Sequence, residues 1–121
     1  MASHNPRVIP IDSLAAAKKE IQNIGSDPKS IHIMAPKAIS RVIRLENVVL
    51  QDAIIIKQDM LSLGGEVAIP KDAFELKKRS ADILMMGTVT QLRDLVKKLK
   101  RHYPRIKTIA AELAILLKEI Y

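Results

Sequence analysis

The chain has 121 residues and a mass of 13.5 kDa, which is the size of one compact domain with its own core. A composition of 48% hydrophobic and 27% charged residues excludes disorder, and only 2% aromatic residues predicts an aliphatic core. The absence of cysteine excludes disulfides, thiolate zinc sites and thiol nucleophiles. The net charge of +7 and the pI near 9.8 favour an anionic partner: nucleic acid, a phosphate-bearing ligand or an acidic protein surface.

No segment predicts export or membrane insertion. The N-terminal stretch from Met1 to Arg7 is polar and lacks the apolar region of a signal peptide. The longest uncharged stretch, Ile83 to Leu92, is about half of the ~20 residues that a membrane-spanning helix needs. We therefore expect a cytoplasmic protein without a membrane span.

The first half of the chain is expected to begin with strands and helices in alternation. Residues 8–11 predict a short strand, confined to a sheet edge by its proline. A helix capped by Asp12 or Ser13 then runs to a glycine stop at Gly25. Residues 30–34 alternate in the pattern of a strand, and a proline begins a helix expected over 36–45.

The second half has stronger signals. A largely buried helix is predicted for 51–63, followed by a glycine pair and a strand over 66–70. After a charged connection, residues 81–86 predict a buried strand. A capping-box pattern then opens a helix over 89–102, and an amphipathic helix ends the chain from about residue 104.

The expected fold is a single compact α/β domain over residues 7–121, with residues 1–6 flexible. The element order is βαβααββαα, and its alternation predicts a mixed, partly parallel sheet of about four strands covered by helices.

Two expected strand-to-helix junctions form the best candidate site. They lie at Ile33 to Lys37 and at Met85 to Thr88. If the two strands are parallel neighbours, the free N–H groups of both helices converge, and Lys37 adds a charge for an anion. The favoured interpretation is structural. Pro36 and Thr88 begin helices, and Gly87 permits close packing. Gly64 and Gly65, included in the candidate site, are also explained as a helix end.

Other candidate groups favour structural roles. Arg93, Lys97, Lys100 and Arg101 share one helix face and could contact nucleic-acid phosphates, but a solvated face is favoured because no aromatic platform accompanies them. The three histidines are too dispersed for a metal site, so neither a metal nor a cofactor is predicted. The carboxylates that flank the glycine pair, Asp59 and Glu66, are explained by solvation at the helix end, and no catalytic residue is predicted.

Three segments resemble the N-terminal region that precedes the pterin-binding barrel in a subset of bacterial and archaeal dihydropteroate synthases. They are Ile31 to Ala38 (IHIMAPKA), Lys57 to Ala68 (KQDMLSLGGEVA) and Asp82 to Leu92 (DILMMGTVTQL). The resemblance runs from about Val8 to the final helix, and its specificity lies in the order and spacing of the segments.

The resemblance implies a non-catalytic accessory domain of folate biosynthesis. The family condenses a dihydropterin pyrophosphate with 4-aminobenzoate in a TIM barrel that carries an Asn-x-Thr-Pro-x-Ser-Phe loop. This chain has no such loop and is far shorter than the ~250 residues of a barrel, so no catalytic residue carries over. The implied partner is a pterin-binding barrel in cis or in trans, which makes the chain an excised domain or a free-standing relative. A homo-oligomer is a further expected partner. The alternative functions are a small basic nucleic-acid-binding module, which is disfavoured, and a stand-alone phosphate- or pterin-binding protein.

Overall fold

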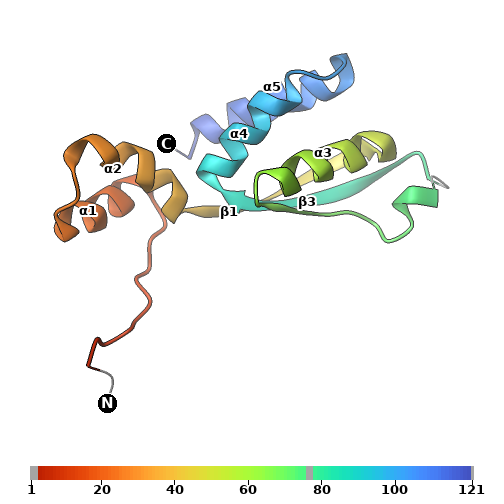
Figure 1. Cartoon of the computed structure of the whole chain (residues 1–121). Helices are drawn as coiled ribbons and strands as arrows, with labels where there is room; N and C mark the ends of the chain where they lie inside the picture. The colour runs from red at the N-terminus through yellow and green to blue at the C-terminus, as the bar shows by residue number, and fades with distance from the viewer. Residues whose placement is uncertain (1–2, 76–77, 121) are drawn as a thin grey trace.

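The computed structural model describes residues 3–75 and 78–120, which form helices around one three-stranded antiparallel sheet (Figure 1). The sheet has the strand order β1-β3-β2. The elements in chain order are α1 (Leu14–Ile24), α2 (Pro28–Met34), the 3-10 turn η1 (Ala35–Ala38), β1 (Ser40–Val49), α3 (Leu50–Ser62), β2 (Glu66–Ala68), the 3-10 turn η2 (Ala73–Glu75), β3 (Ser80–Thr88), α4 (Val89–Leu99) and α5 (Pro104–Lys118).

The predicted sheet is wrong in both strand number and direction. A partly parallel sheet of about four strands in the order βαβααββαα was expected, whereas the described residues form three strands that all pair antiparallel. Two of the predicted strands do not form, and a strand replaces one predicted helix. Over residues 3–75 and 78–120, the sheet therefore has no parallel crossover and no topological switch point.

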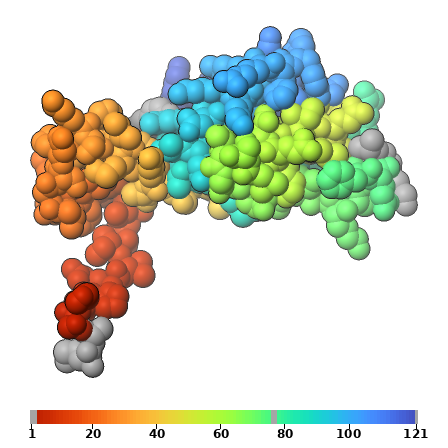
Figure 2. Space-filling model, viewed as in Figure 1, coloured from red at the N-terminus to blue at the C-terminus, as the bar shows by residue number. Residues whose placement is uncertain are grey.

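The first two predicted strands are absent. Residues 8–11 have no regular structure, and Val8 is 92% exposed; the red N-terminal segment extends away from the body (Figure 2). The residues predicted as the second strand lie in α2, where the Asp27 side chain accepts from the main-chain N of Lys29 at 3.0 Å and Pro28 occupies the first turn. A proline at this position is well suited to begin a helix.

The helix predicted over 36–45 is mainly strand β1. The 3-10 turn η1 ends at Ala38, and the chain then pairs with β3 from the Ser40–Thr88 pair onward. Val42 and Ile43 are β-branched, and their burial alternates because Val42 is 63% exposed whereas Ile43 is buried. Branched side chains pack well on a pleated surface, so pairing with β3 outweighs the helical spacing of the apolar residues.

The later predictions agree with the structure. Helices α3, α4 and α5 and strands β2 and β3 lie where the sequence indicates, with ends shifted by a few residues. On the last helix, which was predicted to be amphipathic, Leu113 and Leu117 are buried and Leu116 is 38% exposed. Within residues 3–75 and 78–120, no helix combines the length and apolar character required to cross a membrane.

Helices α3, α4 and α5 lie on one face of the sheet and enclose the main core with it (Figure 1). On that face β3 contributes Ile83 and Met85, while Leu95 and Leu99 come from α4. Helices α1 and α2 pack with η1 at the end of the sheet where β1 begins, around a smaller core. That smaller core contains Ala17, Ala35, Ile39 and Val89.

Candidate functional site

Four of the five residues of the predicted anion site lie together. Gly64 and Gly65 form the turn between α3 and β2, and Gly87 and Thr88 end β3 beside it. The side chain of Gln91 links the two segments. Its Nε2 donates a hydrogen bond to the carbonyl of Leu63 at 3.3 Å, and its Oε1 accepts one from the Thr88 N–H at 2.9 Å. Gly64 has a φ of +88°, a left-handed conformation that favours glycine.

Packing explains two of these glycines. A Cβ on Gly65 would lie 2.8 Å from Sδ and Cε of Met60, and a Cβ on Gly87 would lie 2.7 Å from the same Cε. Met60 is completely buried, and its side chain fills the space that the two glycines leave. Both glycines therefore serve close packing between α3 and the sheet.

Thr88 caps α4 as the sequence predicts. Its Oγ1 accepts from the main-chain N of Gln91 at 3.1 Å, and the Gln91 side chain returns a bond to the Thr88 N–H. This reciprocal pair is a capping box, which satisfies two N–H groups that the helix cannot satisfy itself.

Lys37 lies apart from this pattern, on the exposed side of η1. The strand expected before it is α2, and the helix expected after it is β1, so no helix N-terminus opens at Lys37. The premise of two converging strand-to-helix junctions is therefore wrong, and only the junction at Thr88 exists. Anion binding at these residues stays a prediction.

We expect Thr88→Ala to lower the free energy of unfolding by about 1 kcal/mol, the usual cost of removing an N-cap side chain. Urea denaturation measures the change. If Thr88 is only a cap, phosphate at several millimolar and constant ionic strength should leave the melting temperature of the unaltered protein unchanged.

The matched control is Thr90→Ala, which removes the same hydroxyl two residues further along α4, where it is not the N-cap. An equal loss in both variants would contradict the capping role. A phosphate-dependent rise in melting temperature that Lys37→Ala abolishes would establish the anion site.

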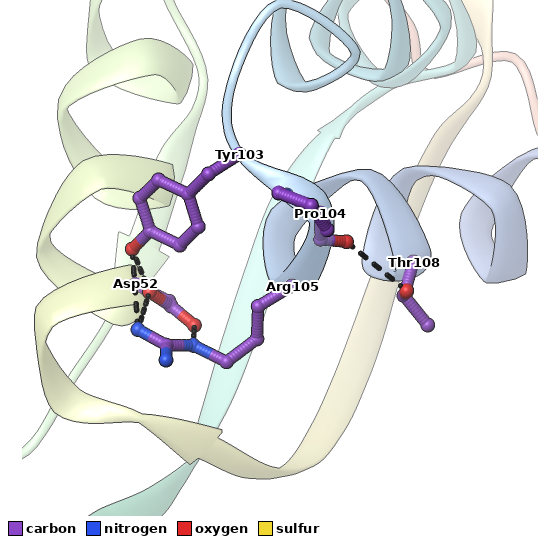
Figure 3. A network of polar contacts seen from close by, with 5 residues as sticks. All are labelled: Asp52, Tyr103, Pro104, Arg105 and Thr108. Carbon is purple, nitrogen blue, oxygen red and sulfur yellow. Dashed lines mark hydrogen bonds and ion pairs between the residues drawn. The ribbon is translucent and has the colours of Figure 1, made fainter.

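The sequence did not single out the buried carboxylate of Asp52 (Figure 3). Asp52 lies in the first turn of α3 with a relative exposure of 0%, while Tyr103 and Arg105 come from the start of α5. Asp52 Oδ1 accepts a hydrogen bond from the Tyr103 hydroxyl and a second one, 2.9 Å long, from Arg105 Nη2. Asp52 Oδ2 accepts a hydrogen bond from Arg105 Nε at 2.5 Å. Two charge-assisted bonds from one guanidinium give a bidentate pair.

The cluster holds Asp52 in its ionised form. Burial by itself would raise the pKa of Asp52, but the hydrogen bonds from Arg105 and Tyr103 and the charge of Arg105 outweigh it, so the pKa is lowered. The bond to Asp52 raises the pKa of Tyr103, with burial adding to the effect. Since the carboxylate oxygens are already occupied by donors, the arrangement suits a clamp between α3 and α5 better than a general base.

A cavity of about 460 Å³ lies beside this clamp. Its walls are β1 from Arg44 to Val49, Asp52, and the face of α5 that carries Arg105, Thr108 and Glu112. The volume is within the range of small-molecule sites. The cavity combines a strand edge with charges of both signs.

A bulge in β1 shapes the cavity wall. The register with β3 shifts between Leu45 and Val48, and Asn47 there has a φ of +53°. Asp82 of β3 stabilises the bulge by accepting from the main-chain N of Asn47 at 3.2 Å and from Arg44 at 2.8 Å. Bulges of this kind bend a strand and interrupt its edge.

The other candidate residues pair separately. Asp59 Oδ2 lies 2.9 Å from Nε2 of His102, whereas Glu66 accepts from Lys57 Nζ at 2.8 Å. The two carboxylates that flank the glycine turn therefore do not act on a common group. Among the described residues, no group of three or more histidine and carboxylate side chains is placed to hold a metal ion.

Of the basic helix stripe, Arg93, Lys97 and Lys100 line one groove between α4 and α5, and Arg101 lines a separate hollow with His102. The positive charge of the stripe is therefore divided between two surfaces, and Lys100 and Arg101 follow the last residue of α4.

Comparison with known proteins gives one significant relative. A bifunctional dihydropteroate synthase/dihydropteroate reductase from Helicobacter pylori (strain ATCC 700392 / 26695) is 30% identical over 103 residues, which cover 85% of this chain and 27% of the relative. The chain thus spans about a quarter of the length of the curated relative that it matches. No family model matches the chain, and no solved structure matches it significantly. Over most of its length, the chain is similar to part of a dihydropteroate synthase.

Proposed function

We propose that this chain is a non-catalytic accessory domain in dihydropteroate (folate) biosynthesis that docks on a catalytic barrel. The observation that carries the proposal is the similarity to the bifunctional synthase/reductase, which extends over 85% of this chain but only 27% of the relative. A relationship of this extent supports a role as one module of a larger enzyme.

The architecture supports the non-catalytic part of the proposal. A three-stranded antiparallel sheet with helices on one face differs from the eightfold parallel barrel in which the synthase family carries its chemistry. Asp52, the buried carboxylate, is engaged by Arg105 and Tyr103, so it serves the packing of α5 on α3. These features suit a rigid docking module.

We expect the purified chain to form no dihydropteroate from dihydropterin pyrophosphate and 4-aminobenzoate, because the pterin loop and the barrel are absent from its sequence. Product formation is measured by chromatography against a reaction without protein. Turnover above that background would contradict the proposal.

The docking part is tested by calorimetric titration of the chain into a dihydropteroate synthase barrel from the same genome. An unrelated barrel of similar net charge is the control, since the chain is strongly basic. Equal heat with both barrels would indicate charge attraction alone and contradict specific docking. The alternative of a stand-alone phosphate- or pterin-binding protein is tested by the melting measurement with phosphate.

A further inference from the structure

We propose that the groove between α4 and α5 binds an acidic amphipathic helix of a partner protein. The groove has a volume of about 300 Å³. Its floor is aliphatic, formed by the buried Val96 and Leu117 with Ala114, and its rim carries the exposed cations Lys97, Lys100 and Lys118; Arg93 also lines the groove. This inference does not depend on the folate assignment, because it uses only the shape and charge of this surface.

Charge selects an anionic occupant. Every ionisable residue that lines the groove is a cation, contributed by both helices. The nearby carboxylate of Asp94 lies 4.0 Å from Lys97 Nζ, and the two side chains are 46% and 77% exposed, so this ion pair neutralises little. Lys100 and Lys118 complete a positive rim to which a row of carboxylates is complementary.

The apolar residues that line the groove favour a helix with an apolar face. Helices α4 and α5 pack against each other and are joined by a short connection over residues 100–103 (Figure 1). The groove is lined by residues of both helices. A third helix can lay side chains at i, i+3, i+4 and i+7 into such a groove. Exposed lysines such as Lys97 and Lys100 can cover apolar surface with their aliphatic stems while their ammonium groups stay in water.

The floor disfavours nucleic acid. Sequence-independent binding of single strands relies on aromatic side chains for base stacking, and Val96, Ala114 and Leu117 offer none. Tyr103, the aromatic residue at the end of this hairpin, is engaged with Asp52 against α3. A flat lipid surface would reach the rim but leave the concave floor empty.

The test is fluorescence anisotropy with the whole chain and a labelled peptide of about 20 residues, with leucine at i, i+3, i+4 and i+7 and glutamate at most other positions. A scrambled peptide of the same composition keeps the charge but loses the apolar face. We expect the amphipathic peptide to bind and the scrambled peptide to bind roughly tenfold more weakly or worse.

Two variants probe the rim and the floor separately. Lys97→Glu with Lys118→Glu should weaken peptide binding by about tenfold or more, and raised salt should weaken the unaltered complex. Ala114→Phe should fill the floor and weaken peptide binding without any change in charge.

Lys18→Glu with Lys19→Glu, on the exposed side of α1, is the control, because it makes the same change in charge away from the groove and should change peptide binding little. Circular dichroism verifies that each variant is folded.

Three outcomes would overturn the proposal. The first is equal binding of the two peptides, which would reduce the groove to a patch of charge. The second is tighter binding of a single-stranded oligonucleotide of equal charge that the rim variant abolishes. The third is no binding of the amphipathic peptide even at low ionic strength.

Discussion

Met60→Ala should lower the free energy of unfolding by about 2–5 kcal/mol, because the variant leaves a cavity in the main core. Met60 has a relative exposure of 0% and lies between α3 and the sheet, against Gly65 and Gly87. Urea denaturation at neutral pH measures the loss. A change below about 1 kcal/mol would show that the site collapses or that the side chain is not packed as described.

A second substitution tests the contact itself. A methyl group on Gly87 would meet Met60 Cε at 2.7 Å, so Gly87→Ala should destabilise the protein. In the Met60→Ala background the contact with Met60 Cε is removed and the nearest remaining neighbour is Gln91 Oε1 at 3.1 Å, so the double variant should lose less stability than the sum of the single losses. Leu95→Ala, a buried substitution on α4, is the matched background in which Gly87→Ala should lose its full amount. Additive losses in both backgrounds would contradict the close approach.

Asp52→Ala should lower the free energy of unfolding by about 3 kcal/mol at neutral pH, the upper end of what one hydrogen bond to a charged group contributes, because the half-exposed Arg105 can bind water when its partner is removed. The variant removes the anchor that joins the start of α5 to α3. Asp82→Ala is the control, because it removes an aspartate that also pairs with an arginine but has a 39% exposed side chain. Its loss should be much smaller.

The same cluster predicts a pH dependence. The folded-state pKa of Asp52 lies below its ordinary value, so its contribution is complete above the ordinary carboxyl pKa and is lost as the pH falls through the folded-state value. The difference in stability between the unaltered protein and Asp52→Ala should therefore shrink in acid. Arg105→Met leaves a buried carboxylate that protonation relieves, so the loss of stability caused by this variant should also shrink in acid. A difference that stays constant from neutral to acid pH would contradict the ionised clamp.

The second half of the fold was predictable because its signals are local. The capping box of Thr88 and Gln91 correctly predicts the start of α4, since both bonds join residues three positions apart. The glycine after α3 has the left-handed conformation that ends a helix, and the apolar face of α5 follows helical spacing. Each of these features is contained within a few neighbouring residues.

In the first half, the helix between Ser13 and Gly25 is confirmed, but the other segments were predicted wrongly because they are short and their periods are ambiguous. Ile31 and Ile33 alternate as in a strand, but a capped first turn makes the segment helix α2, with Ile33 54% exposed. Val42 and Ile43 fit a helical spacing as well as a pleated one, and the partner strand β3 decides between them. Pairing with a segment some 40 residues away is not encoded in a local pattern.

The candidate sites divide in the same way. The sequence indicated that the glycines and Thr88 mattered, but only the tertiary structure shows Gly65 and Gly87 sharing the contact with Met60. The partners of Asp52 lie 51 and 53 positions away, so no spacing rule could have joined them; an aspartate within an apolar helix was the one available signal.

By itself the sequence determined a small aliphatic basic domain, its later helices and strands, the α4 cap and the resemblance to part of a dihydropteroate synthase. Only the tertiary structure decided the antiparallel order β1-β3-β2, the clamp on Asp52 and the groove between α4 and α5. The physical reason is the distance along the chain over which each interaction acts. Capping and helical periodicity act over three or four residues, whereas strand pairing, burial and charge clusters depend on distant segments that meet only when the chain has folded.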